Sequence, residues 1–354
     1  MPQQADPSAP DTFYGRATEL QATGRYEEAV QLLWQGVQHG EVSAMTLLGA
    51  QLISGRGAPP DPGRGAQLML EAAHRGGAYA CAVASALVAK GFFGPKDWER
   101  ALDYLQRSAE LGYVVAQDQL KVLARGPGEA PADPTVWSSL RRSIDLKAWR
   151  FSRPARSLTE DRAIRVVQGF ADPDVCEWIV ARAQGRLGPA LVFSPAAGRP
   201  IRDPDRTGGV AGFDLLSLDL VVLLVMDRLA EACGAPIAAL EPTNVLHYAV
   251  GQQFVPHYDF LDPNLAGTAQ DLARLGQRTR TMLIYLNEGF EGGETDFPLL
   301  GVPFKGRLGD LLIFDNVDGA GAPDRRMLHA GLPPTAGEKW VLSQWVRDHA
   351  PAVG

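Results

Sequence analysis

Two histidines and an aspartate stand at a spacing that could bind a metal ion. The segment 256–260 contains a His-x-Asp motif, His257 and Asp259, and His329 follows 72 residues after His257. Residues two apart on a strand point to the same face, so His257 and Asp259 can share one metal ion, and a later strand can supply His329. Two imidazoles and one carboxylate leave coordination positions open, which suits a non-haem iron(II) site. A His-x-Asp motif alone occurs by chance in many chains, so the prediction depends on its surroundings.

A lysine and a tyrosine lie where they could hold a second ligand of the metal. Lys339 follows His329 by ten residues and precedes a predicted strand over 340–346. There its ammonium group can pair with the distal carboxylate of 2-oxoglutarate while the keto-acid end of that molecule chelates iron. Tyr248 closes a predicted strand over 243–248 and could donate a hydrogen bond to the same carboxylate. With the His-x-Asp motif, these residues predict one site for iron(II) and 2-oxoglutarate.

The surroundings of these residues resemble the catalytic domain of the prolyl 4-hydroxylase family over about residues 163–348. The resemblance implies a double-stranded β-helix, or jelly roll, with supporting helices. The segments that carry it are FADPDVCEWIVARAQGRL, GQQFVPHYDF, YLNEGFEGGET, GDLLIFDN, HAG and EKWVLSQW.

The same resemblance implies a role for each residue of the site. The iron ligands would be His257, Asp259 and His329. Lys339 would pair with the carboxylate of 2-oxoglutarate. The residues that line the pocket of this co-substrate would be Tyr248, Tyr285 and Thr281.

The activity implied is that of an iron(II)- and 2-oxoglutarate-dependent dioxygenase. Such an enzyme consumes O2, converts 2-oxoglutarate to succinate and CO2, and hydroxylates an unactivated C–H bond. The leading substrate is a prolyl residue in a peptide or protein, converted to 4-hydroxyproline, with ascorbate as an accessory reductant. Other functions stay open: hydroxylation of a free amino acid or other small molecule, a catalytically inactive repeat scaffold or binding module, and a zinc hydrolase. The intact ligand set argues against the scaffold, and Lys339 would have no use in a zinc hydrolase.

Short strands that follow helices favour a jelly roll in the C-terminal half. The segment 261–277 is the part that varies most in the family, and we expect it to form part of a substrate lid. Helices are predicted over 172–187 and 217–232, and strands over 243–248, 281–287, 310–314 and 340–346.

The first 125 residues repeat with a period of 36 residues. In each repeat we predict an amphipathic helix and a second helix rich in small residues, with a glycine where the first helix ends. The pattern resembles the Sel1-like branch of the tetratricopeptide family over residues 12–123, which implies a helical solenoid with a protein-interaction surface. The recurring sets are Ala29, Gly65 and Ala101; Val37, Ala73 and Ala109; Gly40, Gly76 and Gly112; and Ala44, Ala80 and Ala116.

Proline, glycine and acidic residues replace the periodic pattern over 124–134, which predicts a linker. We therefore expect helical repeats over 12–123, a linker and connecting segment over 124–156, and the oxygenase domain over 157–348. The repeats either engage a peptide or protein substrate or only pack on the next domain. The sequence leaves the oligomeric state open.

The composition indicates which classes of partner and which cellular compartment to expect. The net charge of −7 argues against a nucleic acid partner, because proteins that bind nucleic acids usually carry a basic surface. Cys81, Cys176 and Cys233 are few and widely separated, which favours a reducing compartment. The start of the chain lacks the apolar core of a signal peptide. The most apolar stretch, 215–226, is too short to span a bilayer. We expect a cytoplasmic protein without a membrane partner.

Overall fold

The computed structural model describes residues 12–125, 135–194, 199–264 and 268–349. The chain divides into two compact units, and neither is continuous in sequence. The first unit is formed by Met1–Asp145 with Asp214–Leu223, and the second by Leu146–Phe213 with Leu224–Gly354. The sequence predicted a continuous helical domain, so the inclusion of Asp214–Leu223 is a difference. The start of the chain and most of the predicted linker lie outside the described residues.

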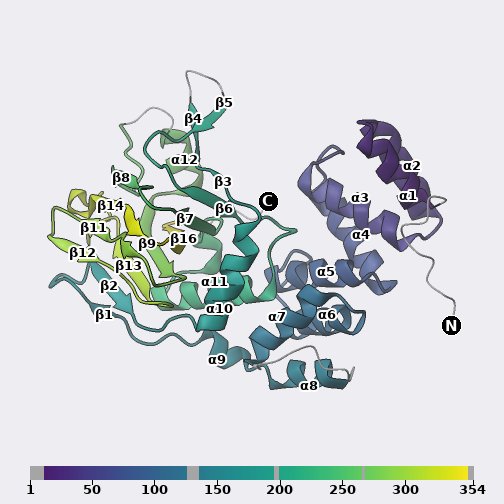
Figure 1. Cartoon of the computed structure of the whole chain (residues 1–354), viewed down its shortest axis with the longest axis horizontal. Helices are drawn as coiled ribbons and strands as arrows, with labels where there is room; N and C mark the ends of the chain where they lie inside the picture. Colours follow the sequence, from purple (N-terminus) through teal and green to yellow (C-terminus); the bar gives the residue numbers. More distant parts are fainter. Residues whose placement is uncertain (1–11, 126–134, 195–198, 265–267, 350–354) are drawn as a thin grey trace. The chain divides into compact units, whose positions relative to one another are not determined.

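Eight helices make up most of the first unit (Figure 1). The first seven each pack on their neighbours in sequence, and the eighth packs on the two before it. Gly40, Gly76 and Gly112 follow the ends of alternate helices with φ angles of 77°, 90° and 88°, the left-handed region that favours glycine. This arrangement confirms the predicted helical repeat. The helices are α1 (Phe13–Ala22), α2 (Tyr26–Gln38), α3 (Val42–Ser54), α4 (Pro62–His74), α5 (Ala78–Lys90), α6 (Trp98–Glu110), α7 (Val114–Ala124) and α8 (Thr135–Ser143).

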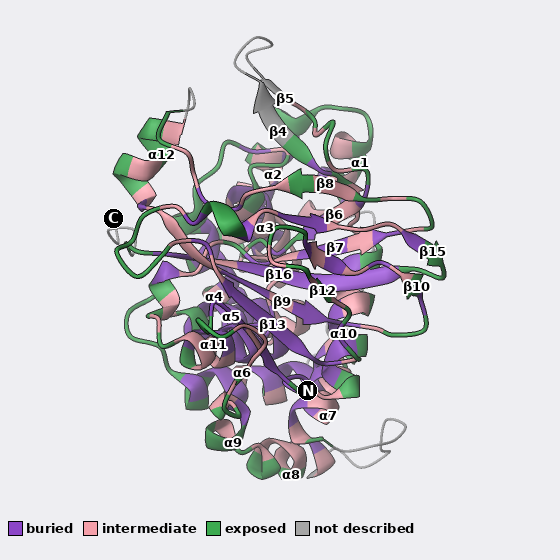
Figure 2. Cartoon of the chain, turned by 90° about the vertical axis from the view of Figure 1, so that its left-hand side faces the viewer, coloured by how far each residue is buried: buried purple, intermediate pink, exposed green. Residues whose placement is uncertain are grey.

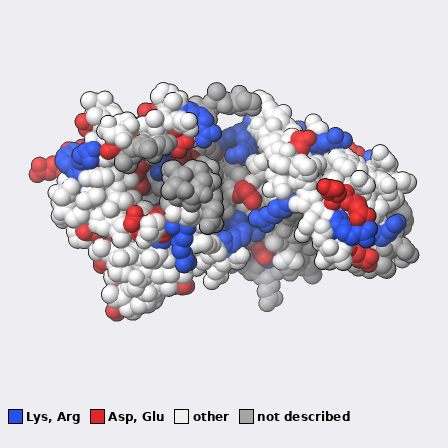
Figure 3. Space-filling model, turned by 90° about the horizontal axis from the view of Figure 1, so that it is seen from above, with Lys and Arg blue, Asp and Glu red and all other residues white. Residues whose placement is uncertain are grey.

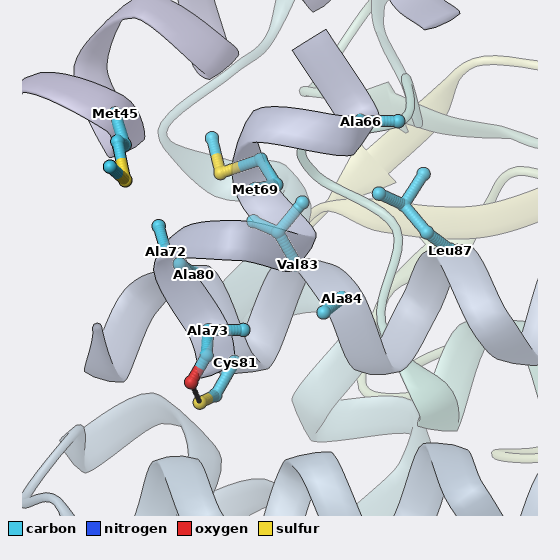
Figure 4. Close-up of a cluster of buried hydrophobic side chains, with 10 residues drawn as sticks. All are labelled: Met45, Ala66, Met69, Ala72, Ala73, Ala80, Cys81, Val83, Ala84 and Leu87. Atoms are coloured by element: carbon cyan, nitrogen blue, oxygen red, sulfur yellow. Dashed lines mark hydrogen bonds between the residues drawn. The ribbon is translucent and has the colours of Figure 1, made fainter. Parts of the chain in front are cut away.

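Small residues allow the helices of this unit to approach one another closely. Gly49 of α3 and Gly65 of α4 face each other, because a Cβ atom on Gly65 would lie 2.7 Å from the carbonyl oxygen of Gly49. Beside this contact, Met45 and Met69 join small side chains of α4 and α5 in a buried cluster (Figure 4). The repeated alanines and glycines therefore act through backbone proximity more than through large side chains.

The separate segment Asp214–Leu223 contributes to the core of this helical unit. Leu215 and Leu216 pack against the buried cluster of α4 and α5. The backbone N–H of Leu220 donates to the side-chain oxygen of Gln119 at 2.8 Å, and this bond is buried. A buried side-chain acceptor without such a donor would cost free energy, so Gln119 and this segment depend on each other.

The second unit is built mainly from short strands. Its larger sheet contains β1 (Arg156–Ser157), β2 (Ile164–Val167), β3 (Gly188–Pro189), β6 (Gly209–Gly212), β7 (Asn244–Tyr248), β9 (Arg278–Tyr285), β13 (Leu311–Asp315) and β16 (Lys339–Arg347). Its smaller sheet contains β8 (Phe254–His257), β11 (Thr295–Phe297), β12 (Val302–Phe304) and β14 (His329–Gly331). Two further pairs are β4 (Leu191–Ser194) with β5 (Arg199–Arg202), and β10 (Glu291–Gly292) with β15 (Pro334–Ala336). The remaining helices are α9 (Leu146–Arg150), α10 (Pro173–Gln184), α11 (Leu220–Cys233), α12 (Thr268–Leu275) and the 3-10 turns η1 (Ile237–Ala239) and η2 (Arg325–Met327).

The two sheets are antiparallel and share a core. The strand order is β1-β2-β13-β9-β16-β7-β6-β3 in the larger sheet and β12-β11-β14-β8 in the smaller. Core side chains come from both, as Phe297 of β11 packs in one cluster with Leu312 of β13 and Val341 of β16. Figure 2 shows the central strands β9, β13 and β16 as largely buried. Two antiparallel sheets around one core confirm the predicted jelly roll.

Most elements predicted for this unit are present with shifted ends. Helices α10 and α11 occupy the predicted helices over 172–187 and 217–232. Strand β9 covers the predicted strand over 281–287 but begins and ends earlier. The segment 261–277 contains a helix, α12, that the sequence did not predict, and its residues 265–267 lie outside the described part. Among the described residues, every helix is too short or too polar to cross a bilayer.

Candidate active site

The three predicted metal ligands meet at one end of the smaller sheet. His257 is the last residue of β8 and His329 is the first of β14, and the two are partners in the strand register. The sequence placed Asp259 on the same strand as His257. In the structure the strand ends at His257, and Asp259 lies in a bend two residues further on. The bend still turns the carboxylate toward the imidazoles, because one ligand atom from each residue lies within 4.8 Å of the others.

Each imidazole is oriented by a backbone carbonyl oxygen. The Nδ1 atom of His257 lies 2.9 Å from the oxygen of Val255, and that of His329 lies 3.0 Å from the oxygen of Met327. Because a carbonyl oxygen only accepts, each Nδ1 carries the hydrogen and donates it. Both Nε2 atoms then point lone pairs at Asp259, 3.6 and 3.5 Å from its oxygens. Lone pairs that face one another repel unless a cation lies between them, so this geometry fits a metal ion.

Burial and charge set the protonation of the cluster. Burial raises the pKa of Asp259, but the two histidines outweigh it and hold the pKa well below its ordinary value. Burial lowers the pKa of His257, against the opposing effect of Asp259. The carboxylate is therefore ionised and this imidazole neutral at pH 7, the forms that bind a metal ion. Two imidazole nitrogens and a carboxylate oxygen are the donor set typical of iron(II) oxygenases.

Lys339 brings a buried positive charge to the same site. It opens β16 opposite Tyr248 of β7, and only 3% of its surface is exposed. Its Nζ atom lies 3.5 Å from the hydroxyl of Thr295, and it forms no ion pair with any described residue. Burial lowers the pKa of Lys339 to about 7, opposed by Glu294 and reinforced by Lys305. A buried ammonium group without a carboxylate partner is suited to bind an anionic ligand.

One pocket joins the metal cluster to Lys339. Its cavity volume is about 40 Å³, taken as the space that the centre of a water molecule can occupy. Strand β16 lines it with Lys339, Val341, Ser343 and Trp345, alternate residues that share one face of the strand. The other walls come from β7, β8, β9, β11 and β14. A ligand in this pocket can therefore touch the metal cluster and the ammonium group together.

The structure places the other predicted residues at different depths. Tyr248 lines the pocket, and burial raises the pKa of its hydroxyl. Thr281 also lines the pocket, but its hydroxyl donates to Asp259 at 2.7 Å. Tyr285 is fully buried behind the wall, where its hydroxyl is 2.8 Å from that of Thr295 and also donates to a backbone carbonyl oxygen. The pocket therefore contains Tyr248 and Thr281, while Tyr285 supports it from the next layer.

Sequence reasoning missed Thr295, Ser343 and Trp345. Thr295 stands two residues after Gly293, and nothing local marks it as part of a pocket. Ser343 and Trp345 could have been found by counting in steps of two along the predicted strand from Lys339, since every second residue faces the same side.

Comparison with known proteins agrees with this site. Residues 243–347 match the 2OG-Fe(II) oxygenase superfamily. Prolyl 4-hydroxylase 1 of Arabidopsis thaliana is 30% identical over 203 residues, which span 53% of this chain and 69% of that relative. The chain belongs to the prolyl 4-hydroxylase family.

Two solved structures resemble separate parts of this prolyl 4-hydroxylase family member. The viral collagen prolyl hydroxylase of Paramecium bursaria Chlorella virus-1 is similar over 54% of this chain and 98% of its own, with 24% identity and a TM-score of 0.41. A Sel1 repeat protein of Oxalobacter formigenes is similar over 36% of this chain and 54% of its own, with 25% identity and a TM-score of 0.29.

Membership of the family brings iron(II), 2-oxoglutarate and O2 as the metal and co-substrates. The residues present fit these groups. His257, Asp259 and His329 would hold the metal, since their donor atoms converge and face a common point. Lys339 would hold the distal carboxylate of 2-oxoglutarate, since it is the buried cation of the same pocket that lacks an ion-pair partner among the described residues.

Proposed function

We propose that this protein hydroxylates a prolyl residue in a peptide or protein to 4-hydroxyproline. The observation that carries the proposal is the single pocket that joins the buried metal-binding cluster to the ammonium group of Lys339. The similarity to prolyl 4-hydroxylase 1 of Arabidopsis thaliana supports the substrate class. Iron(II), 2-oxoglutarate and O2 take part in the reaction, and we propose ascorbate as the reductant that keeps the metal ferrous.

Each residue of the pocket has a definable task. Asp259 and the two imidazoles hold the metal, while Lys339 and Tyr248 hold the distal carboxylate of 2-oxoglutarate. When bound, iron(II) with 2-oxoglutarate and O2 supplies the oxidant that replaces C–H by C–OH, and 2-oxoglutarate leaves as succinate and CO2. Phe254 and Phe314 cover the two imidazoles, with ring centroids 3.5 and 4.6 Å away. These rings exclude water from one side of the metal ligands.

Two hydrogen-bond donors support a peptide as the substrate. Arg206 and Trp345 line the pocket, and the Nε atom of Arg206 and the Nε1 atom of Trp345 are buried without a hydrogen-bond partner among the described residues. Buried donors without a partner are rare in folded proteins, and a ligand can satisfy them. A prolyl residue within a peptide is flanked by backbone carbonyl oxygens that accept such bonds.

The first test measures conversion of 2-oxoglutarate to succinate by the purified protein with iron(II) and ascorbate. We expect slow conversion alone and faster conversion with an accepted proline peptide, which gains the mass of one oxygen atom. Asp259→Ala should abolish both, because the proposed metal site would lose the carboxylate of its ligand set. The matched control is His247→Ala, since His247 faces the other side of β7 and contacts Glu338 at 2.8 Å.

Each alternative has its own outcome in this experiment. Full turnover by the Asp259→Ala protein would contradict the metal assignment. Oxygen transfer to a free amino acid and not to peptides would favour the small-molecule function. A wild-type protein that forms no succinate under any condition would favour the inactive scaffold. The Asp259→Ala protein can also serve as bait to capture the natural protein substrate for mass spectrometry.

We extend the proposal to the helical unit as the part that engages a protein substrate. Stacked helix pairs offer an extended surface, and such surfaces bind extended partners. Arg64 of α4 lies over the ring of Trp34 of α2 at 4.0 Å, and His74 of α4 is 2.7 Å from the hydroxyl of Tyr104 of α6. One contact joins α2 to α4 and the other joins α4 to α6, and both involve an aromatic ring that is only partly buried. Basic and acidic side chains lie next to one another on the face seen in Figure 3, which suits a protein partner.

Substitutions at these two contacts separate recruitment from structural support. If the helical unit recruits the substrate there, Trp34→Ala with Tyr104→Ala should lower hydroxylation of the full-length protein substrate and leave a short peptide unaffected. If the helices only support the fold, both activities and the unfolding temperature should fall together. Wild-type rates on both substrates would count against both roles.

We also propose a cytoplasmic location. Cys81, Cys176 and Cys233 are free thiols, which suits a reducing compartment. Cell fractionation tests this proposal, and recovery of the protein in a secreted or membrane fraction would contradict it.

A further inference from the structure

A buried hydrogen-bond chain connects the metal cluster to the end of β13. The hydroxyl of Thr281 donates to the Oδ2 atom of Asp259 at 2.7 Å, and the side-chain amide of Asn316 donates to the hydroxyl of Thr281 at 2.9 Å. Thr281 and Asn316 are each 1% exposed, and Asp259 is 6% exposed. The chain therefore runs from an amide through a hydroxyl to a carboxylate in surroundings with little access to water.

The chemistry of the three groups fixes the direction of the chain. The NH2 group of Asn316 only donates, an ionised carboxylate only accepts, and a hydroxyl has one hydrogen to donate. Thr281 accepts the bond from Asn316, so its own hydrogen goes to Asp259. A hydrogen bond to a charged acceptor is roughly twice as strong as one between neutral groups. Successive bonds in buried surroundings also polarise one another.

The backbone holds both donors firmly. Thr281 lies in β9 opposite Phe314 of β13, near the centre of the larger sheet. Asn316 directly follows β13, where its N–H donates to the oxygen of Thr279 at 2.8 Å and its oxygen accepts from the N–H of Asp324 at 3.0 Å. Asp259 itself lies in a bend beyond the end of β8. The sheet therefore supplies the rigidity that the bend around Asp259 lacks.

We propose that Thr281 and Asn316 are positioning residues for the metal ligand Asp259. The Thr281 hydroxyl fixes the rotation of the carboxylate, so that one oxygen faces each imidazole at 3.6 and 3.5 Å. It also takes up a lone pair of Oδ2 that would otherwise be free to bind the metal as a second carboxylate donor. The inference rests on the proposed function and assigns Thr281 to the metal ligand, where the sequence assigned it to 2-oxoglutarate. Asn316 gains a role although it does not line the pocket.

Titration of the full-length protein with Mn(II), which binds without turnover, tests this proposal. Thr281→Val removes the hydroxyl at nearly constant volume, and it should weaken Mn(II) binding about 10- to 100-fold, as loss of a ligand's hydrogen-bond partner does elsewhere. The 2-oxoglutarate affinity of the Mn(II)-saturated protein should change little. Thr281→Ser keeps the hydroxyl and should keep wild-type Mn(II) affinity. Asn316→Ala breaks only the outer link and should have a smaller effect than Thr281→Val.

A double variant distinguishes a chain from two independent contributions. Because Asn316 acts through Thr281, the protein with both Thr281→Val and Asn316→Ala should bind Mn(II) no more weakly than Thr281→Val alone. Additive losses would overturn the proposal, as would unchanged Mn(II) affinity in Thr281→Val. A loss of 2-oxoglutarate affinity with normal Mn(II) binding would also overturn it, because Thr281 would then belong to the co-substrate pocket.

Two controls keep the result interpretable. The unfolding temperature of each variant without metal shows whether it folds. If Thr281→Val does not fold, Asn316→Ala decides the matter, and unchanged Mn(II) affinity there overturns the chain. Asp259→Ala separates this inference from the proposed function. Wild-type Mn(II) binding by Asp259→Ala would defeat both, whereas weak binding by Asp259→Ala with normal binding by Thr281→Val would defeat only the positioning role.

Discussion

The two units of the chain bury different kinds of residue. The core of the helical unit is made largely of alanine, leucine and methionine, and its one buried carboxylate among the described residues is Asp219. The β unit buries Asp259, His329 and Lys339 around one pocket. Buried charge opposes folding unless it is paired, so it remains mainly where a function requires it. The helices are therefore organised for close approach, and the β unit for chemistry.

Removing a buried charge from the β unit should produce the largest effect. Lys339→Met keeps much of the side-chain volume but leaves the bound carboxylate without a partner, which costs about 3–5 kcal/mol and raises the dissociation constant of 2-oxoglutarate at least about 100-fold. The unfolding temperature of the ligand-free protein should not fall, because Lys339 has no ion pair with a described residue to lose. Isothermal titration and thermal unfolding measure the two quantities. Unchanged 2-oxoglutarate affinity would show that the buried ammonium group has another role.

Adding one carbon atom to the helical unit should lower the stability of the protein and leave its affinity for 2-oxoglutarate unchanged. A Cβ atom in Gly65→Ala would lie 2.7 Å from the Gly49 carbonyl oxygen, so α3 and α4 must move apart, and we expect a loss of about 1–3 kcal/mol in stability. The dissociation constant of 2-oxoglutarate should stay at the wild-type value. Gly63→Ala in the same helix is the control, because its nearest neighbour would be a side-chain oxygen at 3.7 Å. Equal unfolding free energies for the two variants would show that the close approach of α3 and α4 at Gly65 does not limit stability.

The pH dependence of 2-oxoglutarate binding should show the smallest of these effects. The pKa of Lys339 is lowered to about 7 by burial, so the free protein loses this proton as the pH rises through 7. A bound carboxylate favours the charged form, so binding above pH 7 must take up a proton. Affinity should therefore weaken by up to about tenfold for each pH unit above 7. Lys339→Arg should bind less well but lose this pH dependence, because a guanidinium group stays charged. A flat wild-type profile would mean that Lys339 is charged without its ligand.

The sequence was sufficient to predict the site residues that are recognisable by their type and their spacing along the chain. His257, Asp259 and His329 belong to segments that resemble a known family, and Lys339 lies at a fixed distance from His329. The structure brings these four side chains to one pocket, and their roles in binding iron and 2-oxoglutarate stay predictions. The helical repeats were equally accessible, because a period of 36 residues is visible without any knowledge of the fold.

The residues that the sequence did not predict depend on pairing between distant segments. Asn316 reaches Thr281 only because β13 and β9 are neighbours in the sheet, and neither residue has a local signal for this contact. Thr295 of β11 approaches Lys339 of β16, 44 residues further along the chain, because both sheets line the same pocket. Helix α12 was missed although Ala269, Leu272 and Ala273 have helical spacing, and none of its eight residues is buried, so no contact with the core marks it.

The place of Asp214–Leu223 in the helical unit bears on how the protein is made. Chains emerge from the ribosome N-terminus first, and domains generally fold as units once they are complete. The helices through Asp145 are synthesised early, yet Leu215 and Leu216, which cover part of their core, arrive only after the first stretch of the β unit. The helical unit must therefore wait for a later part of the chain, with apolar surface uncovered in the meantime. No single cut of the chain separates the two units, so a truncation after Asp145 removes Asp214–Leu223 from the helical unit.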